Sequence, residues 1–184
     1  MVKHSIFLSI FTFFILCLNT SVSGQHQHKD LTSSYAGQED QEIKSLSADD
    51  IKGLKKGSGT PFGGMAKPAE LSGYPGPRHV LDAHDAGRLE LSQEQITNIN
   101  ALFTSMEQAA IPLGEKIIAV EKQLTEAFAE KTINSNSLKE LINQSAELYA
   151  ELRFVHLNTH LSMMGILTEE QIESYNKLRG YTLS

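Results

Sequence analysis

The sequence predicts an all-α fold: a long antiparallel helical hairpin with a kinked first helix, short flanking helices and assembly as a dimer. Two long stretches carry apolar residues three and four positions apart, which is the spacing of one helix face. A turn rich in Asn and Ser, residues 131–137, separates the two stretches. Two six-residue motifs, Leu91–Ile96 and Leu167–Ile172, each begin an amphipathic run with a Ser or Thr that can cap a helix.

Residues 1–24 are predicted to be a secretory signal peptide. Lys3 supplies the positive start, residues 6–18 form an apolar run, and small residues, Ser21 to Ser23, precede the cleavage point. The apolar run is shorter than the roughly 20 residues that a membrane span needs. Cys17, the only cysteine, leaves with the signal, so the mature chain has no thiol for a disulfide or for catalysis.

The net charge argues against nucleic acid as a partner. The whole chain carries a charge of −6, and removal of the signal deletes one Lys and no acid, which makes the charge −7. No stretch of the sequence forms a basic patch. No second apolar run is long enough to span a bilayer, so we expect no stable membrane insertion after cleavage.

The segment between the signal and the hairpin divides into two parts. Residues 25–46 are polar and are predicted to be flexible. Residues 47–77 are predicted to hold a short helix, capped by Ser47 and ending at Gly57, followed by a Gly/Pro-rich loop. The stretch 57–77 contains six glycines and four of the five prolines, which favours a linker or an ordered surface loop over a helix. It lacks the Lys-Ser/Thr pair of a phosphate-binding loop.

The hairpin domain is predicted to cover residues 78–181. A short helix is expected over His79–Gly87, and the first long helix over about 93–130. Pro112 should kink the long helix because it removes one backbone hydrogen bond, and Gly114 makes a bend easier. The predicted seam of apolar residues on this helix is Ile96, Ile99, Phe103, Met106, Ala110, Leu113, Ile117, Val120, Leu124 and Phe128 (or Ala127).

The second long helix is predicted over about 138–164, with Ser137 and Glu140 as a weak capping box and Gly165 as a left-handed stop. Its seam becomes polar toward the far end: Leu138, Leu141, Ser145, Leu148, Leu152, Val155, Thr159 and Ser162. A last helix is expected over about 169–179, ending at Gly180. Two such rods alone bury little surface, so we expect the short helices or a second chain to cover them.

A histidine pair in the second helix is a candidate metal site. His156 and His160 are four apart and lie on one helix stripe, and Met163 or Met164 could add a sulfur. Zn, Cu, Ni or Co are the metals that such donors suit. Further ligands would come from Glu107, Glu115, Glu121, His79 or His84. The alternative is that these histidines are hydrogen-bonded within the hairpin and that the methionines fill the core.

Other polar residues give weaker signals. Arg153 is expected to pair with an acid of the facing helix, Glu107 or Glu121. No nucleophile has a base at a suitable spacing, so an enzyme is not expected. If cleavage follows Ser23, the new terminus Gly24-Gln25-His26 would offer a square-planar nest for copper(II) or nickel(II).

The capping motifs are the most specific feature of the chain, and their residues are Leu91, Ser92, Gln95, Leu167, Thr168 and Gln171. Two such L-T-x-x-Q motifs on an exported helical hairpin resemble the Spy/CpxP family of bacterial periplasmic proteins. Further stretches resemble one bacterial branch of that superfamily: Tyr35-Ala36-Gly37, Ala69-Glu70-Leu71, Tyr74-Pro75-Gly76-Pro77-x-His79-Val80-Leu81, Leu152-Arg153-x-x-His156-Leu157-x-x-His160-Leu161 and Leu178-Arg179-Gly180-Tyr181. The resemblance covers about Tyr35–Tyr181.

The resemblance implies a periplasmic envelope-stress protein with no reaction of its own. Spy-like members form cradle-shaped homodimers that hold unfolded or envelope protein clients, without a required cofactor. Metal-sensing relatives bind nickel or cobalt through His, Glu and Met on the hairpin, which His160 and Met164 could match. This chain differs from Spy in its acidic charge and in its extra Gly/Pro-rich segment. Two functions therefore remain open: polypeptide binding on a helical cradle, and metal binding by a sensor or buffer.

Overall fold

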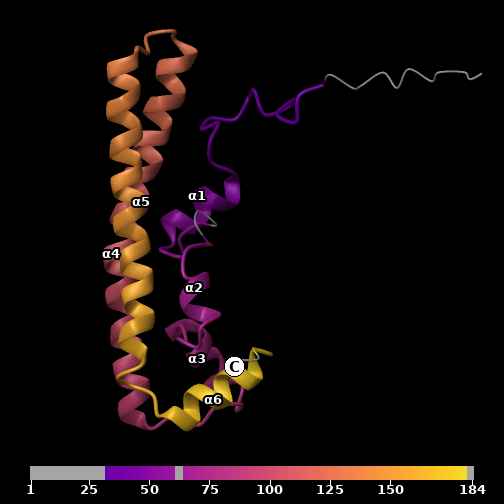
Figure 1. Ribbon diagram of the computed structural model, residues 1–184, viewed down its shortest axis with the longest axis vertical. Helices are drawn as coiled ribbons and strands as arrows, with labels where there is room; N and C mark the ends of the chain where they lie inside the picture. The colour runs from indigo at the N-terminus through magenta and orange to yellow at the C-terminus, as the bar shows by residue number, and fades with distance from the viewer. Residues whose placement is uncertain (1–31, 61–63, 182–184) are drawn as a thin grey trace, which may run out of the picture. The chain divides into compact units, whose positions relative to one another are not determined.

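Figure 1 shows the computed structural model of the chain, in which residues 32–60 and 64–181 are described. A first unit ends at Ala36, and its described part holds a turn in which the Ala36 N–H donates to the Ser33 carbonyl. The second unit begins at Gly37 and contains six helices, with no strand among its described residues. The predicted signal peptide and the predicted copper-binding terminus lie outside the described residues.

Two long helices form the predicted antiparallel hairpin. They are α4 (Gln93–Ala129) and α5 (Ser135–Met163), which pack side by side along their length (Figure 1). At about 1.5 Å per residue, α4 is about 55 Å long. The helix continues through Pro112 without an interruption. The all-α hairpin predicted from the apolar spacing is confirmed.

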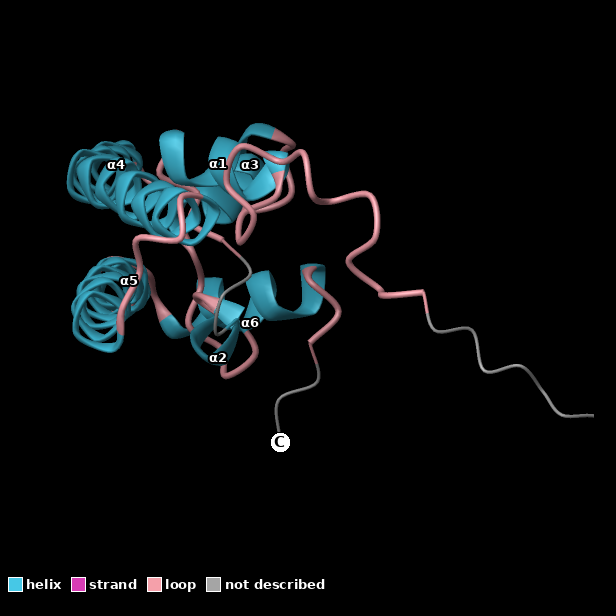
Figure 2. Ribbon diagram, turned by 90° about the horizontal axis from the view of Figure 1, so that it is seen from above, coloured by secondary structure: helices cyan, strands magenta, loops and turns pink. Residues whose placement is uncertain are grey.

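Four short helices accompany the hairpin: α1 (Ala48–Lys55), α2 (Lys67–Glu70), α3 (Pro77–Asp85) and α6 (Glu169–Leu178). Viewed from above, all four lie on the same side of the hairpin (Figure 2). Helices α1 and α3 contact α4, whereas α2 and α3 contact α5. The expectation that short helices cover the two rods is therefore met on that one side.

The contact between α1 and α4 depends on a glycine. A Cβ built on Gly114 would overlap the carbonyl oxygen of Leu54 and would lie 2.8 Å from its carbonyl carbon. Real side chains do not approach backbone atoms so closely, so only glycine allows the end of α1 to rest on α4. The sequence predicted that Gly114 would ease a bend, but its role in the structure is this close backbone approach.

The buried residues form two clusters at different levels of the hairpin. The first cluster joins α1 and the segment before it to the middle of the hairpin, and its members are Ile43, Leu46, Leu54, Met65, Ala110, Ile117, Tyr149 and Leu152. The second cluster joins α3 and α6 to the open end of the hairpin, and its members are Val80, Leu81, Leu89, Ile99, Met163, Leu167 and Tyr175. Each cluster thus attaches one group of short elements to the two rods.

Two predictions about the segment before the hairpin are wrong. Residues 57–77 are not a surface loop throughout, because Lys67–Glu70 forms α2 and the stretch Pro75–Pro77 is buried. Within the stretch predicted to be flexible, Ile43 and Leu46 are buried in the first cluster. Composition indicated solvent exposure, but glycine and proline also let a chain lie close to a helix surface, as they do here.

Two predicted helix boundaries are also corrected. Helix α5 begins three residues early, because the Asn134 side chain, not that of Ser137, accepts from the N–H groups of Asn136 and Ser137. The predicted Ser137–Glu140 box is therefore replaced by an Asn134–Ser137 box. Gly165 does not adopt the left-handed conformation, whereas Gly57, Gly87 and Gly180 do.

The predicted seams agree with the burial except at their ends. On α4, Phe128 is 54% exposed and Ala127 is half-buried, so the alternative residue is the one that packs. On α5, Ser162 is exposed, and buried Met163 lies in the core instead. Among the described helices, none combines the length and the hydrophobicity that crossing a membrane requires.

Candidate functional site

The two capping motifs meet in space and bind each other. The Gln95 Nε2 donates to the Gln171 Oε1 (2.7 Å), and the Gln171 Nε2 donates to the Gln95 Oε1 (3.0 Å). Each Oε1 also accepts from the N–H of its own cap, Ser92 or Thr168. The predicted capping boxes are thus confirmed, and the structure adds a reciprocal amide pair between them.

The second donor of each glutamine extends this symmetry. Gln95 Nε2 also donates to the carbonyl of Ile166, and Gln171 Nε2 donates to the carbonyl of Glu90, both at 2.9 Å. Each acceptor carbonyl lies two residues before the cap of the other motif. Each amide group therefore makes four hydrogen bonds, which is its full capacity, so the pair fixes the start of α4 to the start of α6.

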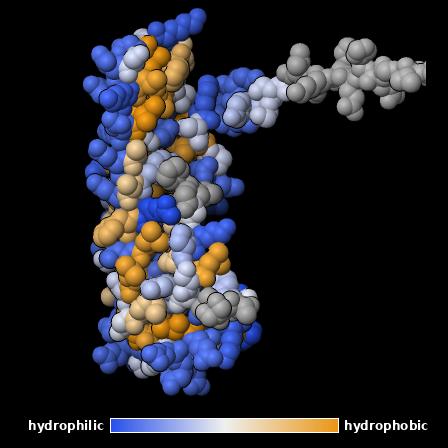
Figure 3. Space-filling view, in the orientation of Figure 1, coloured by the Kyte–Doolittle hydropathy of each residue, from blue (hydrophilic) through white to orange (hydrophobic). Residues whose placement is uncertain are grey.

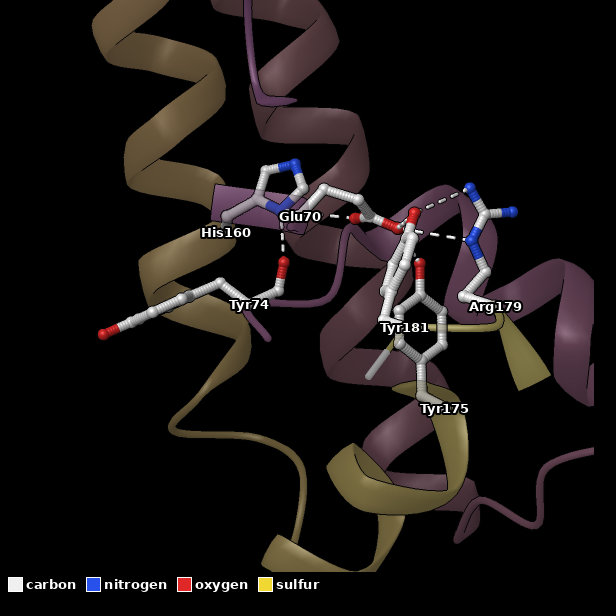
Figure 4. Close-up of polar contacts among 6 residues, drawn as sticks. All are labelled: Glu70, Tyr74, His160, Tyr175, Arg179 and Tyr181. Atoms are coloured by element: carbon white, nitrogen blue, oxygen red, sulfur yellow. Dashed lines mark hydrogen bonds and ion pairs between the residues drawn. The ribbon is translucent and has the colours of Figure 1, made fainter. Parts of the chain in front are cut away.

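A second polar cluster centres on Glu70 of α2 (Figure 4). Its Oε1 accepts from the hydroxyls of Tyr175 (2.5 Å) and Tyr181 (3.2 Å) and lies 3.3 Å from the Nε of Arg179. Its Oε2 faces His160 at 3.8 Å and finds no hydrogen-bond partner within the described part of the chain. Burial, with Glu70 adding to it, raises the pKa of the Tyr175 hydroxyl well above its usual range.

The Glu70 cluster was not predicted from the sequence as a site. Glu70 comes from a stretch predicted to be a loop, and its partners come from the C-terminal helix and the residues after it. The only signal was that Ala69-Glu70-Leu71 and Leu178-Arg179-Gly180-Tyr181 belonged to the family resemblance. The cluster ties α2, α5 and the C-terminal end of the chain together.

The predicted histidine pair is buried against the loops before and after α2, which hold Gly59 and Gly76 respectively. His160 donates from Nδ1 to the carbonyl of Tyr74 (2.7 Å), which leaves its Nε2 as the acceptor when the ring is neutral. His156 is also buried, and its Nε2 has no hydrogen-bond partner among the residues that the structure describes. Burial, and then the neighbouring His160, lowers the pKa of His156 below its usual value.

A cavity of about 610 Å³ brings several of the proposed ligands to one place. His79, Glu107, His156 and His160 all line it, together with residues of the loop after α1, the start of α3 and α4. The predicted sulfur ligands do not share it: Met163 is fully buried in the second cluster, and Met164 is exposed. Within residues 32–60 and 64–181, no three His, Cys, Asp or Glu side chains are grouped closely enough to hold a metal ion.

Other proposed ligands lie elsewhere. Glu121 accepts from the hydroxyls of Ser145 (2.5 Å) and Ser45 (2.6 Å), so it anchors the segment before α1 to the hairpin. His84 contacts the carbonyl of Leu89 through Nδ1 (3.0 Å). The predicted pairing of Arg153 with Glu107 or Glu121 is not formed, since the Arg153 Nε has no hydrogen-bond partner among the residues described. Glu115 is exposed on α4.

A stripe of apolar side chains on α5 is left uncovered. Three of its members are strongly exposed: Phe154 at 67%, Leu161 at 57% and Ile142 at 49%. Figure 3 shows hydrophobic side chains along the length of α5. We call this surface the outer stripe; it consists of Ile142, Ala146, Ala150, Phe154, Leu157, Leu161 and Met164, and of these only Leu157 is half-buried.

The outer stripe continues into hollows near the tip of the hairpin. Ile142 and Ala146 line a cavity of about 350 Å³ with Leu124 and Tyr149. A neighbouring cavity of about 380 Å³ is lined by Leu124 and Phe128, the second of which is half-exposed. Hollows of this kind can receive apolar side chains of a partner.

Comparisons of this chain with protein-family models, with curated proteins and with solved structures found no match.

Proposed function

We propose that this protein is an exported, non-enzymatic envelope-stress protein of Spy/CpxP type that binds unfolded or partner polypeptide. The observation that carries the proposal is the outer stripe, since a monomeric helix normally turns its large apolar side chains toward a core. Of the large hydrophobic residues that the structure describes, three of the most exposed lie on this one helix face. Contiguous exposed apolar patches mark interaction surfaces.

The dimensions of the outer stripe suit a peptide segment. From Ile142 to Met164 it extends for about 33 Å at ~1.5 Å per residue. That length fits about ten residues of extended chain or about six turns of helix. The hollows lined by Leu124 and Phe128 supply depressions at one end, where an apolar side chain loses contact with water.

Light scattering during aggregation of reduced lysozyme tests the proposal. We expect the protein at a twofold molar excess to suppress the rise in scattering. The double variant Phe154→Ser/Leu161→Ser should lose most of this effect, with circular dichroism confirming its fold. The matched control is Phe103→Ser, which changes a half-buried residue of α4 away from the stripe. An absence of suppression by the wild type would contradict the proposal.

Metal binding is the second candidate function, and the hydrogen bond of His160 favours it. Metal-binding histidines commonly donate their second ring N–H to a carbonyl, as His160 does to Tyr74. The Nε2 of His156, one helical turn away, is buried and has no hydrogen-bond partner among the described residues. A site built on this pair would take Zn, Cu, Ni or Co, and His79 or Glu107 of the same cavity would have to move closer to serve as a further ligand.

Calorimetric titration distinguishes this candidate. We expect zinc, copper, nickel or cobalt to give heat with the wild type and none with His156→Ala/His160→Ala. The control variant His84→Ala removes a histidine outside the cavity. Binding should weaken as the pH falls below about 6.5, where imidazole takes up a proton. Equal heats from all three proteins would exclude the histidine pair.

A further inference from the structure

One side of the outer stripe is edged by acidic residues. Glu140, Glu147 and Glu151 are all exposed on α5, at spacings of seven and four residues, which place them on one row along the helix. No ion pair joins any of them to another described residue. The outer stripe therefore has an acidic row along its solvent side.

Two cations lie on the stripe itself by helical spacing. Half-buried Arg153 is seven residues after Ala146 and four before Leu157, and exposed Lys139 is seven residues before Ala146. The three acids outnumber these two cations, and the whole chain has a net charge of −6. The electrostatic potential is therefore negative along the edge of the outer stripe that carries the three glutamates. A negative potential raises the encounter rate with positively charged partners.

The spacing within the stripe indicates the conformation of the partner. Ala150, Phe154, Leu157, Leu161 and Met164 follow one another at intervals of four, three, four and three residues. This is the repeat by which one helix packs along another. An extended segment, whose side chains alternate every two residues, would match only some of these positions.

We propose that the outer stripe binds a basic amphipathic helix of another protein, with its apolar residues on the stripe and its Lys or Arg side chains beside Glu140, Glu147 and Glu151. This inference rests on the proposed polypeptide-binding function and names its partner class. A second copy of the chain fits less well. Antiparallel docking of two copies along this face would place their acidic rows side by side, where like charges repel.

The test uses three synthetic peptides of about 23 residues, the length of the stripe at ~1.5 Å per residue. The first carries Leu at a three-four repeat with Lys at the flanking positions. The second carries Glu in place of Lys, and the third has the composition of the first in scrambled order. Fluorescence anisotropy of labelled peptides measures binding to the full chain at low and high salt. We expect only the first peptide to bind, and more weakly at high salt.

Charge-reversal variants separate the acidic row from the apolar stripe. We expect Glu140→Lys/Glu147→Lys/Glu151→Lys to weaken binding of the Lys peptide by roughly tenfold or more, given ordinary surface ion-pair strengths. Glu90→Lys/Glu115→Lys/Glu130→Lys, which changes the net charge equally at exposed sites off the stripe, is the matched control and should bind nearly as wild type. Phe154→Ser/Leu161→Ser should abolish binding of the Lys peptide.

Each outcome decides between the two proposals. If Lys and Glu peptides bind equally, and the reversal of the acidic row has no effect, the partner is not basic, although the polypeptide-binding function stands. If no peptide binds and no client is protected, both proposals fail. Sedimentation of the wild type and of Phe154→Ser/Leu161→Ser detects the remaining alternative. A dimer that becomes a monomer in the variant would assign the stripe to a second copy and overturn the inference.

Discussion

The two helices of the hairpin differ in what covers them. Both α4 and α5 bury a seam against each other; α4 also contacts α1 and α3, and α5 also contacts α2 and α3, which leave the outer stripe uncovered. On α4, Phe128 near the tip is the one large apolar residue among those strongly exposed. On α5, three such residues remain exposed: Ile142, Phe154 and Leu161.

This difference does not follow from composition, because α5 is the less hydrophobic helix of the two. It follows from where the short elements pack. The chain before the hairpin is held on α4 by the close approach at Gly114 and by the hydrogen bond that Glu121 accepts from Ser45. The outer stripe is therefore a feature of the assembled fold, and an apolar surface kept open in this way favours an interaction site.

The largest expected effect compares two leucines of α5. Leu152→Ala removes a fully buried side chain of the first cluster and should lower the free energy of unfolding by about 3 kcal/mol. Leu161→Ala, on the outer stripe, should change it by less than about 0.5 kcal/mol. Urea denaturation followed by circular dichroism measures both. Similar losses for the two variants would mean that the outer stripe is covered in solution.

Gly114→Ala should disrupt the packing of α1 on α4. The added methyl group would overlap the backbone of Leu54, so α1 must move, at a cost of about 2 kcal/mol in unfolding free energy. Gly165→Ala is the control, because a Cβ there has only the carbonyl oxygen of Ser162 nearby, at 3.6 Å. Thermal denaturation of the two variants gives the comparison. An unchanged Gly114→Ala protein would show that α1 does not rest on α4.

The glutamine pair joins the start of α4 to the start of α6. Gln95→Ala or Gln171→Ala should each cost about 2 kcal/mol, since each leaves polar groups of the partner unpaired. The double variant should lose less than the sum, because the same pairing is removed only once. Gln123→Ala, at an exposed position of α4, serves as the control in the same urea series. Strict additivity would contradict the reciprocal pairing.

The smallest expected effect is on pH dependence. The pKa of His156 is lowered by burial and by His160, whereas the unfolded chain has the ordinary value near 6.5. Below about pH 6.5 the unfolded state therefore binds more protons, and stability falls by at most ~1.4 kcal/mol per pH unit from this group. His156→Gln should reduce the fall in the free energy of unfolding between pH 7 and pH 5, which urea denaturation at each pH measures. If the variant shows the same fall as the wild type, other groups cause it.

The helices and their caps could be predicted because the responsible residues are close in sequence. Ser47, Ser92 and Thr168 each act on a residue three positions later, and Gly57, Gly87 and Gly180 end helices by their own conformation. Asn134 was missed as a cap because Ser137 offered a similar signal three residues on. Gly165 was predicted to end α5 in the left-handed conformation, but it does not adopt that conformation in the structure.

The candidate site could be predicted only in part. The four-residue spacing of His156 and His160 placed both rings on one face of α5, but the spacing did not reveal that Tyr74 accepts from His160. Met163 and Met164 are adjacent in sequence, so they point to different sides of the helix, one into the core and one outward. Glu70 was missed because its partners lie more than one hundred residues away.

By itself the sequence determined the two long helices, their facing seams and the capping motifs at their ends, because these depend on residue spacing within a few turns. The tertiary structure alone decided that Gln95 contacts Gln171, that Glu70 binds Tyr175, Arg179 and Tyr181, and that the outer stripe of α5 stays uncovered. Those features depend on which surfaces approach each other across the fold, and the spacing of residues along one helix does not specify that approach.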